Sequence, residues 1–490
     1  MTSTPKGRNT ITATKARNNI SRLILKAIGI FGGVQAVGII CSIIRTKLVA
    51  IWLGPVGVGL FGLFNNALEM LNTATNLGIR SSSVRDISQA LDRHDSTLVG
   101  RIIGVVRRWS LWLGLGGALL TLILAPLLSQ WTFGSPSYLW GFVALSAAVL
   151  LMAVTNGEQA VLQGTAQLKR LANVSLWGTI LGLAVSVPLF YWLRERSVIP
   201  SIIAYALANA LMAFLLRDRK YPHQTVSRRE TAAIGAGFVK LGIYMTVGTF
   251  VTILMGYVFN AWLNQHDGTT AVGHYQAGYT LINKYTGLIL AALGMEYFPR
   301  LSRVATHRSR LRIFVSQEIN ITLLVMAPVI AWFIVLRDPI VRLLYSTDFL
   351  VVEGMITRGI VGTAMRALSW CMAFVILAKG DGPTYVVTES LSAVLGLALN
   401  IVCYLTWGLT GLGIAFTLWY LAYVLIVGCV YFFRYKLTLS PATAGSVLWV
   451  TAVAVGMMLL TDSGHLIAAG ALAFISLIFS GWMLYKQWAR

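Results

Sequence analysis

Long apolar stretches and short polar connections alternate along the whole chain. About fourteen stretches are each long enough to cross a hydrocarbon layer of about 30 Å. Their uniform apolarity predicts helices, because barrel strands show short alternating patterns instead. The expected spans cover residues 23–44, 56–79, 109–129, 138–158, 172–193, 198–216, 242–263, 271–297, 319–337, 355–379, 387–408, 411–433, 444–461 and 465–485. The pattern therefore predicts an all-α polytopic membrane protein with about fourteen transmembrane helices.

Basic residues fall on every second connection. They gather in the N-terminal arm, in the loop after the second span, and around residues 169–170, 217–240, 300–312 and 434–436. The positive-inside rule places these loops and both termini on the cytoplasmic side. The net charge of +22 is then explained by anionic lipid headgroups, so no nucleic-acid partner is expected.

An internal repeat emerges when the chain is shifted by about 214 to 216 positions. The matching pairs are Val58-Gly59 with Val272-Gly273, Leu181–Ala184 with Leu395–Ala398, Gly164 with Gly380, and Tyr205 with Tyr420. The shift covers six spans, an even number, so the two halves have the same orientation about an axis along the membrane normal. Two such lobes would enclose a central cavity, and rocking them would open it to each side in turn.

The expected organisation has five parts. A disordered cytoplasmic arm (1–22) precedes an N-terminal six-helix lobe (23–216), and a basic cytoplasmic linker (217–241) leads to a C-terminal six-helix lobe (242–433). Two additional helices (444–485) lie outside the duplication.

Ionic side chains within the spans are the first candidates for function. Glu69 lies in the second span, and the repeat places Asn283 opposite it and Lys284 one position further on. A mid-bilayer charge costs about 2.5 to 3.5 kcal/mol, so two opposite charges in related places indicate a purpose. Lys284 could receive an anionic group of a substrate, with Glu69 as its resting partner or a proton carrier. The alternative is an ion pair that only locks the lobes.

Further polar groups extend this candidate site. Arg366 in the tenth span could bind phosphate oxygens or merely hydrogen-bond to neighbouring helices. Arg45, Lys47 and Arg80 lie near predicted span ends; they are candidate substrate contacts, although snorkelling to headgroups is their simpler explanation. A helical stripe in the second span could bind sugar hydroxyls or join helices. The stripe contains Asn65, Asn66, Glu69, Asn72, Thr73 and Asn76.

Enzyme motifs are absent from the sequence. There is no phosphate-binding G-x-x-x-x-G-K-[ST] motif and no paired-histidine metal motif, and the four cysteines lie at unrelated spacings. We therefore expect a transporter with no catalytic site, metal or cofactor. Energy for uphill movement would come from a proton or sodium gradient or from consumption of the transported substrate elsewhere.

Three segments resemble a known transporter family. They are Leu53-Gly54-Pro55-Val56-Gly57-Val58-Gly59-Leu60, the region from Val272 to Ser302, and Leu377-Ala378-Lys379-Gly380-Asp381-Gly382. Together with the two halves, they are similar to the Wzx-type O-antigen and common-antigen flippases. These form the polysaccharide transporter branch of the multidrug/oligosaccharidyl-lipid/polysaccharide (MOP) exporter superfamily. Members of that branch often have twelve spans, whereas the two extra spans here resemble the lipid II flippases.

This resemblance implies a function in the bacterial cytoplasmic (inner) membrane. The substrate would be an undecaprenyl-pyrophosphate-linked oligosaccharide that is moved from the cytoplasmic to the periplasmic leaflet for surface polysaccharide assembly. A polysaccharide polymerase and a chain-length regulator would be partners. The alternatives are an ion-coupled multidrug exporter of the same superfamily, a lipid II flippase, and a membrane glycosyl polymerase or ligase. The last usually needs a sizeable periplasmic loop, and the longest outer connection, about residues 338–354, is short.

Overall fold

The computed structural model describes residues 8–76, 78–93, 95–221 and 226–488. Within these ranges the chain is helical and contains no β-strand. Residues 1–7 of the arm that we predicted to be disordered lie outside the description. The rest of the arm is already helical from Arg8 onward, because its Ala, Lys and Arg residues favour a helix and continue directly into the first apolar stretch.

The first half of the chain forms six long helices and two shorter elements before the basic linker. They are α1 (Arg8–Asn76), α2 (Ile79–Asp92), α3 (Ser96–Phe133), η1 (Pro136–Tyr138), α4 (Leu139–Gly164), α5 (Leu168–Leu193), η2 (Arg194–Ser197) and α6 (Val198–Leu215).

The second half repeats this arrangement and adds two helices. Its elements are α7 (Arg228–Tyr279), η3 (Thr280–Lys284), α8 (Tyr285–Val304), α9 (Arg308–Val335), α10 (Arg337–Leu344), η4 (Thr347–Val352), α11 (Glu353–Ala378), α12 (Gly382–Cys429), η5 (Val430–Arg434), α13 (Pro441–Asp462) and α14 (Leu466–Trp488). Helix α7 begins at Arg228, so the predicted linker 217–241 is helical over its second part.

The breaks and turns of the long helices in the first half are matched in the second half 214 residues later. Gly54 interrupts α1 at φ 65° and Gly268 interrupts α7 at φ 81°, a conformation that suits a residue without a Cβ. Left-handed residues also end α5 at Arg194 and divide α12 at Gly408. Both pairs are separated by 214 positions. The connection that we predicted between residues 44 and 56 is instead helical up to the break at Gly54.

The same spacing corrects two pairs of the predicted repeat. Ala166, rather than Gly164, is the left-handed residue that corresponds to Gly380. Tyr205 packs over Gly182 in the first half, and at a shift of 214 Trp419 packs over Gly396. Trp419, rather than Tyr420, is therefore the equivalent of Tyr205. A match between single residues of the two halves can be wrong by one or two positions. A turn or a close contact that recurs in both halves fixes which residues are equivalent.

Ten helical stretches in the described part of the chain are long and apolar enough to span a membrane. Four of them contain 44 to 59 residues, twice what one pass needs, and each contains one of the breaks or turns described above. They are Gly33–Asn76, Leu168–Leu215, Thr246–Val304 and Gly382–Arg434. The protein is therefore a multi-pass helical membrane protein. The count of fourteen passes stays a prediction.

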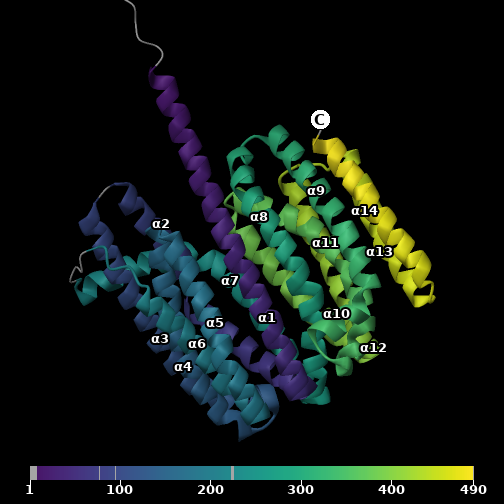
Figure 1. Cartoon of the computed structure of the whole chain (residues 1–490), viewed down its shortest axis with the longest axis horizontal. Helices are drawn as coiled ribbons and strands as arrows, with labels where there is room; N and C mark the ends of the chain where they lie inside the picture. Colours follow the sequence, from purple (N-terminus) through teal and green to yellow (C-terminus); the bar gives the residue numbers. More distant parts are fainter. Residues whose placement is uncertain (1–7, 77, 94, 222–225, 489–490) are drawn as a thin grey trace, which may run out of the picture.

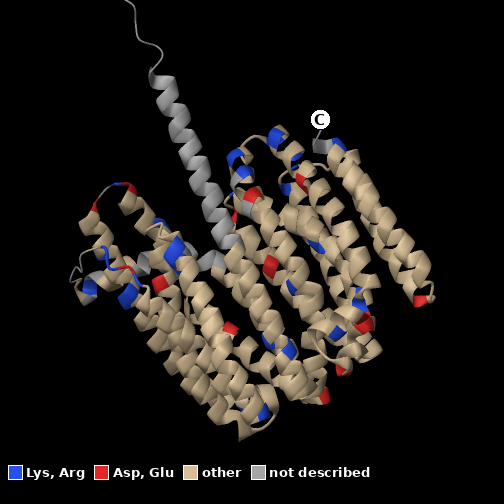
Figure 2. Ribbon diagram, in the orientation of Figure 1, with Lys and Arg blue, Asp and Glu red and all other residues tan. Residues whose placement is uncertain are grey.

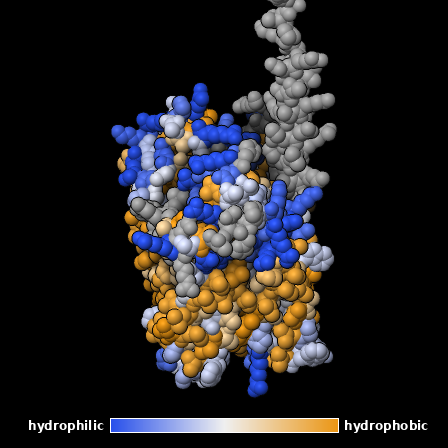
Figure 3. All heavy atoms as spheres, turned by 90° about the vertical axis from the view of Figure 1, so that its left-hand side faces the viewer, coloured by the Kyte–Doolittle hydropathy of each residue, from blue (hydrophilic) through white to orange (hydrophobic). Residues whose placement is uncertain are grey.

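The helices gather into two groups beside α1. Figure 1 shows α2–α6 on one side and α8–α12 on the other, with α1 between them. Helices α13 and α14 cover the outer side of the second group, where both pack against α9. Figure 3 shows a broad apolar band on the face that it presents, and Figure 2 shows many Lys and Arg residues at the upper end of the molecule. We call that end, where the α2–α3, α8–α9 and α12–α13 connections lie, the basic face.

Candidate functional site

The two halves touch most closely where α1 crosses α7, just after their glycine breaks. A Cβ on Gly59 would overlap the carbonyl oxygen of Thr269, and a Cβ on Gly273 would overlap that of Pro55. Each contact becomes the other when residue numbers are shifted by 214. The crossing is therefore symmetric, and only glycine lets the two backbones approach this closely.

Three adjoining cavities surround this crossing, and together we call them the central cavity. The first, of about 300 Å³, contains Glu69, Asn66 and Asn283 in its lining. The second, of about 200 Å³, shares Asn66 with the first and is also lined by Lys284. The third, of about 280 Å³, lies within the first half and shares Arg45 and Asn65 with the second. Most of the predicted site residues therefore meet in one region.

Lys284 ends the π-helical turn η3 and is exposed within the central cavity. Its Nζ donates a hydrogen bond to Ser42 Oγ of α1 at 3.1 Å, so it joins the two halves. Glu69 lines the neighbouring cavity and is also exposed. Among the described residues no ion pair joins these two side chains, which leaves both accessible to a ligand.

Arg45 lies deeper than the sequence indicates. Because α1 continues to Gly54, Arg45 lies roughly 13 Å before the end of that helical segment. Its guanidinium contacts the rings of Phe61 at 5.3 Å and Tyr205 at 4.9 Å, which stabilise the cation. Snorkelling from a span end therefore does not explain it.

Lys47 and Arg80 occupy other surroundings. Lys47 Nζ donates to the carbonyl oxygens of Arg342, at 2.6 Å, and Tyr345, at the C-terminal end of α10. It thereby links the first half to the second, and its positive charge suits a helix C-terminus. Arg80 is exposed on the first turn of α2. A role of either residue in substrate binding stays a prediction.

Arg366 holds the turn that carries Lys284. Its Nη1 donates to Asn283 O at 2.7 Å and to Thr286 Oγ1 at 3.3 Å, and its guanidinium lies 5.7 Å from the Tyr420 ring. This geometry is the helix-to-helix hydrogen bonding that the sequence left as one of two alternatives. Arg366 can position Lys284 without itself contacting a ligand.

Several amide side chains of the central cavity are absent from the predicted set. Gln276 donates to Asn260 Oδ1 at 2.7 Å, and both line the first cavity. Asn156 lines the third cavity and donates to Asn72 Oδ1 at 3.5 Å, which connects the predicted Asn72 to the cavity wall. Asn209 also lines the third cavity. A search for every uncharged amide within the apolar stretches would have found these residues.

The halves are also joined at the face opposite the basic face, where α3 ends. Asn264 of α7 donates to the carbonyl of Thr132 at 2.8 Å, and Tyr257 shares a 2.5 Å hydrogen bond with the Thr132 hydroxyl. With the contacts of Lys47, these bonds close the molecule at that end. Within the described residues no cluster of three His, Cys, Asp or Glu side chains could hold a metal ion.

Two like-shaped helical halves around a polar cavity are an architecture typical of membrane transporters. The chain belongs to the family of polysaccharide biosynthesis proteins, whose sequence pattern matches residues 40–353. It is 24% identical over 357 residues to the lipid III flippase of Escherichia coli K12, covering 70% of this chain and 82% of that protein. This relative is a transport protein rather than an enzyme.

Solved structures show the same fold. The lipid II flippase MurJ in an inward closed conformation is similar with a TM-score of 0.72 and 14% identity, over 94% of this chain and 99% of that chain. An inward-facing multidrug resistance transporter of the MATE family, a member of the MOP superfamily, matches with a TM-score of 0.67 and 14% identity, over 84% and 95%. The chain therefore has the MOP transporter fold, which confirms the superfamily that its motifs resemble.

Proposed function

We propose that the protein flips an undecaprenyl-pyrophosphate-linked oligosaccharide across the bacterial inner membrane by alternating access. The central cavity carries this proposal. It places the cations Arg45 and Lys284 beside the amides of Asn65 and Asn66, between two halves that can rock against each other. Cations suit a pyrophosphate, amides suit sugar hydroxyls, and the polyprenyl tail can stay in lipid.

The family and the flippase among its relatives support the same substrate class. Lys284 and Arg45 would receive the pyrophosphate, while Asn65, Asn66, Asn72 and Asn283 would contact the sugars. Glu69 would carry the proton or sodium ion that couples transport to a gradient. A polymerase with its chain-length regulator would take the product in the opposite leaflet, and both termini would face the cytoplasm.

Reconstitution of the full chain in liposomes tests this proposal. Lipid-linked oligosaccharide is placed in the membrane, and the sugars that reach the far leaflet are counted by an added, membrane-impermeant glycosidase. We expect wild-type protein to move the substrate and Lys284→Gln to lose at least about nine-tenths of the rate. The control is Lys486→Gln, which removes a cation that contacts Trp482 on α14, and it should transport normally. Equal activity of Lys284→Gln and wild type would refute the assignment.

Lipid II flipping is the second candidate, because the similarity to the lipid II flippase covers 94% of this chain. The same liposomes loaded with lipid II distinguish the two. Movement of lipid II without movement of the oligosaccharide lipid would favour this alternative. Movement of small cationic dyes alone would instead indicate a drug exporter.

A further inference from the structure

A large cavity of the described protein lies away from the central cavity. It has a volume of about 1120 Å³ and lies at the basic face between α9, the segment that joins η5 to α13, and α14. We call it the α9–α13 cavity. Its cations are Arg308, Arg312 and Lys436, and its apolar wall includes Ile313 and Leu484.

The rim of the α9–α13 cavity is cationic and carries no carboxylate of its own. The residues that line it include no Asp and no Glu. Arg308 donates to the carbonyl of Lys436, and Arg312 donates through Nε to the carbonyl of Thr438 at 3.2 Å. These bonds hold both guanidinium groups at the rim. The two Nη groups of Arg312 have no hydrogen-bond partner among the described residues, so they can bind an anion.

The N-terminus of α9 has no negatively charged side chain in its first turn, although the positive end of the helix dipole favours one. His307, which precedes that turn, provides no side-chain cap. In the first half, Asp95 caps α3 by accepting hydrogen bonds from the N–H groups of Thr97 at 3.0 Å and Leu98 at 2.9 Å. At the repeat spacing of 214, Ser309 stands where the first half has Asp95. Arginines at a helix N-terminus are unfavourable unless a negative charge lies close by.

Two buried polar atoms point to a ligand deeper in the same cavity. Ser316 is 5% exposed and Asn320 is 7% exposed, and both line the cavity. Ser316 Oγ and Asn320 Oδ1 have no hydrogen-bond partner among the described residues. A buried polar group that is left unpaired is destabilising, so a ligand that pairs with it is favoured. Since Asn320 lies roughly 18 Å along α9 from Arg308, the polar positions extend from the rim into the apolar layer.

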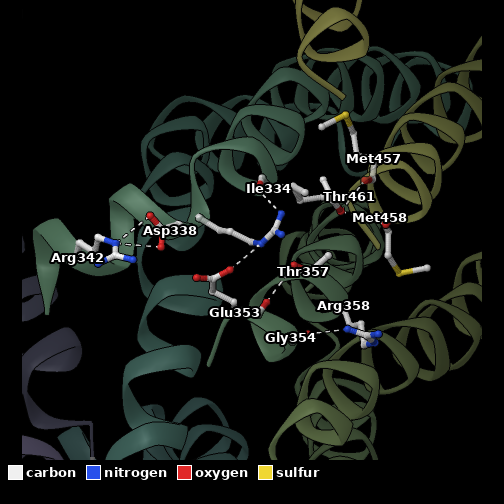
Figure 4. Close-up of polar contacts among 11 residues, drawn as sticks. Ile334, Asp338, Arg342, Glu353, Gly354, Thr357, Arg358, Met457, Met458 and Thr461 are labelled. Atoms are coloured by element: carbon white, nitrogen blue, oxygen red, sulfur yellow. Dashed lines mark hydrogen bonds and ion pairs between the residues drawn. The ribbon is translucent and has the colours of Figure 1, made fainter. Parts of the chain in front are cut away.

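Side chains hold α13 differently at its other end. There Arg358 of α11 forms an ion pair of 3.4 Å with Asp462 at the end of α13. Figure 4 shows this region, in which the Thr461 hydroxyl hydrogen-bonds within α13 and Glu353 binds Arg337 at 3.1 Å. The ion pair with Arg358 therefore attaches α13 at the face opposite the basic face. At the basic face, the Thr443 hydroxyl of α13 donates to the carbonyl oxygen of Ser316 on α9 at 3.3 Å. At the basic face, a cavity takes up much of the space between α9 and the start of α13.

From these observations we propose that an anionic phospholipid occupies the α9–α13 cavity and attaches α13 and α14 to α9. Its phosphate lies between Arg308, Arg312 and Lys436, where it supplies the negative charge that the α9 terminus lacks. Its ester groups meet Ser316 and Asn320, and an acyl chain follows the apolar wall. This lipid is a bound component of the membrane and differs from the transported substrate.

Binding of phosphatidylglycerol to the purified full chain in detergent tests the proposal, with native mass spectrometry to count bound lipids. We expect phosphatidylglycerol to bind more tightly than phosphatidylcholine. The double variant Arg308→Ala/Arg312→Ala should weaken phosphatidylglycerol binding by about tenfold or more. The matched control is Arg310→Ala, which removes a charge from the same helix terminus but not from the cavity lining, and it should change binding by less than about twofold.

A second variant separates loss of binding from loss of folding. Ser309→Asp introduces in the first turn of α9 the aspartate that the first half has at the equivalent position, Asp95. A carboxylate there stabilises the helix. Thermal stability should therefore be equal to or above that of wild type, while phosphatidylglycerol binding falls at least about threefold through charge repulsion. Unchanged binding in this variant, or an equal loss in Arg310→Ala, would overturn the proposal. Displacement of the lipid by equimolar undecaprenyl phosphate would also overturn it, by assigning the cavity to the substrate.

Discussion

The two halves of the chain share a backbone pattern but differ in charge. The crossing of α1 and α7 looks the same from either side, because Gly59 meets Thr269 as Gly273 meets Pro55. The charges do not follow this symmetry. At a shift of 214, Lys284 corresponds to Met70 in the first half.

This difference separates what builds the transporter from what its cavity binds. Backbone contacts at the crossing tolerate no side chain, so both copies keep glycine. The cavity walls are free to diverge, and each half contributes a different cation. Such an asymmetric lining suits a ligand with a charged end and a sugar end.

The largest expected effect comes from breaking the shared backbone contact. Gly59→Ala and Gly273→Ala each push a methyl group into a carbonyl oxygen, and overpacking of this kind costs about 1–3 kcal/mol. Both variants should lower the thermal unfolding temperature in detergent by similar amounts. Gly38→Ala, whose Cβ would contact nothing within 4 Å, should not lower it. A large difference between the two crossing variants would mean that the contact is not symmetric.

Replacing Lys284 with the residue of the first half tests the difference in charge. Lys284→Met should abolish flipping in liposomes while leaving the unfolding temperature close to that of wild type, because the side chain makes only an exposed hydrogen bond to Ser42. The reciprocal variant Met70→Lys should not restore transport in the Lys284→Met background. Restored transport would show that the side of the cavity carrying the cation does not matter.

The matching exchange at Arg366 should affect stability first. Met152 stands at the equivalent position of the first half, so the variant is Arg366→Met. It removes the donor to Asn283 O and should destabilise the protein by about 1–2 kcal/mol, measured as a lower unfolding temperature. Residual flipping should exceed that of Lys284→Met. If stability is unchanged and flipping is lost, Arg366 contacts the substrate directly.

The smallest effect concerns the cap of α3. Hydrogen bonds from the Thr97 hydroxyl and the Leu98 N–H lower the pKa of Asp95 in the folded protein. The stabilising contribution of the ionised Asp95 side chain is therefore present above the unfolded pKa of about 3.9. It is lost as the pH falls through the lower pKa of Asp95 in the folded protein. Asp95→Ala should lower the unfolding temperature slightly at pH 7. The difference in unfolding temperature between wild type and Asp95→Ala should begin to shrink only below about pH 4.

Much of the fold follows from the sequence, because apolar length and basic loops are physical requirements of a membrane span. The cavity residues Glu69 and Lys284 were found for a related reason, since a charge within the apolar layer is costly unless water or a ligand reaches it. The first span is predicted to end at residue 44, whereas the helix continues to the break at Gly54, because Arg45 and Lys47 look like the polar end of a span. Only packing shows that Arg45 lies between two aromatic rings.

Other features depend on contacts between distant segments and could not be predicted. The role of Arg366 depends on a carbonyl of η3, and a sequence cannot tell a hydrogen bond to the backbone from one to a ligand. The α9–α13 cavity is lined from three separate segments, with Asn320 and Ser316 more than a hundred positions before Lys436. None of these residues forms a motif with its neighbours.

Site-specific photocrosslinking is the most direct test of the central claim that the cavity between the halves receives the lipid-linked substrate. A photoreactive amino acid is placed at Asn66, in the central cavity, and at Leu119, which is 59% exposed on the apolar surface. We expect crosslinks from Asn66 to both the pyrophosphate lipid and its sugars, and none to the sugars from Leu119. Sugar crosslinks from Leu119 with none from Asn66 would contradict it.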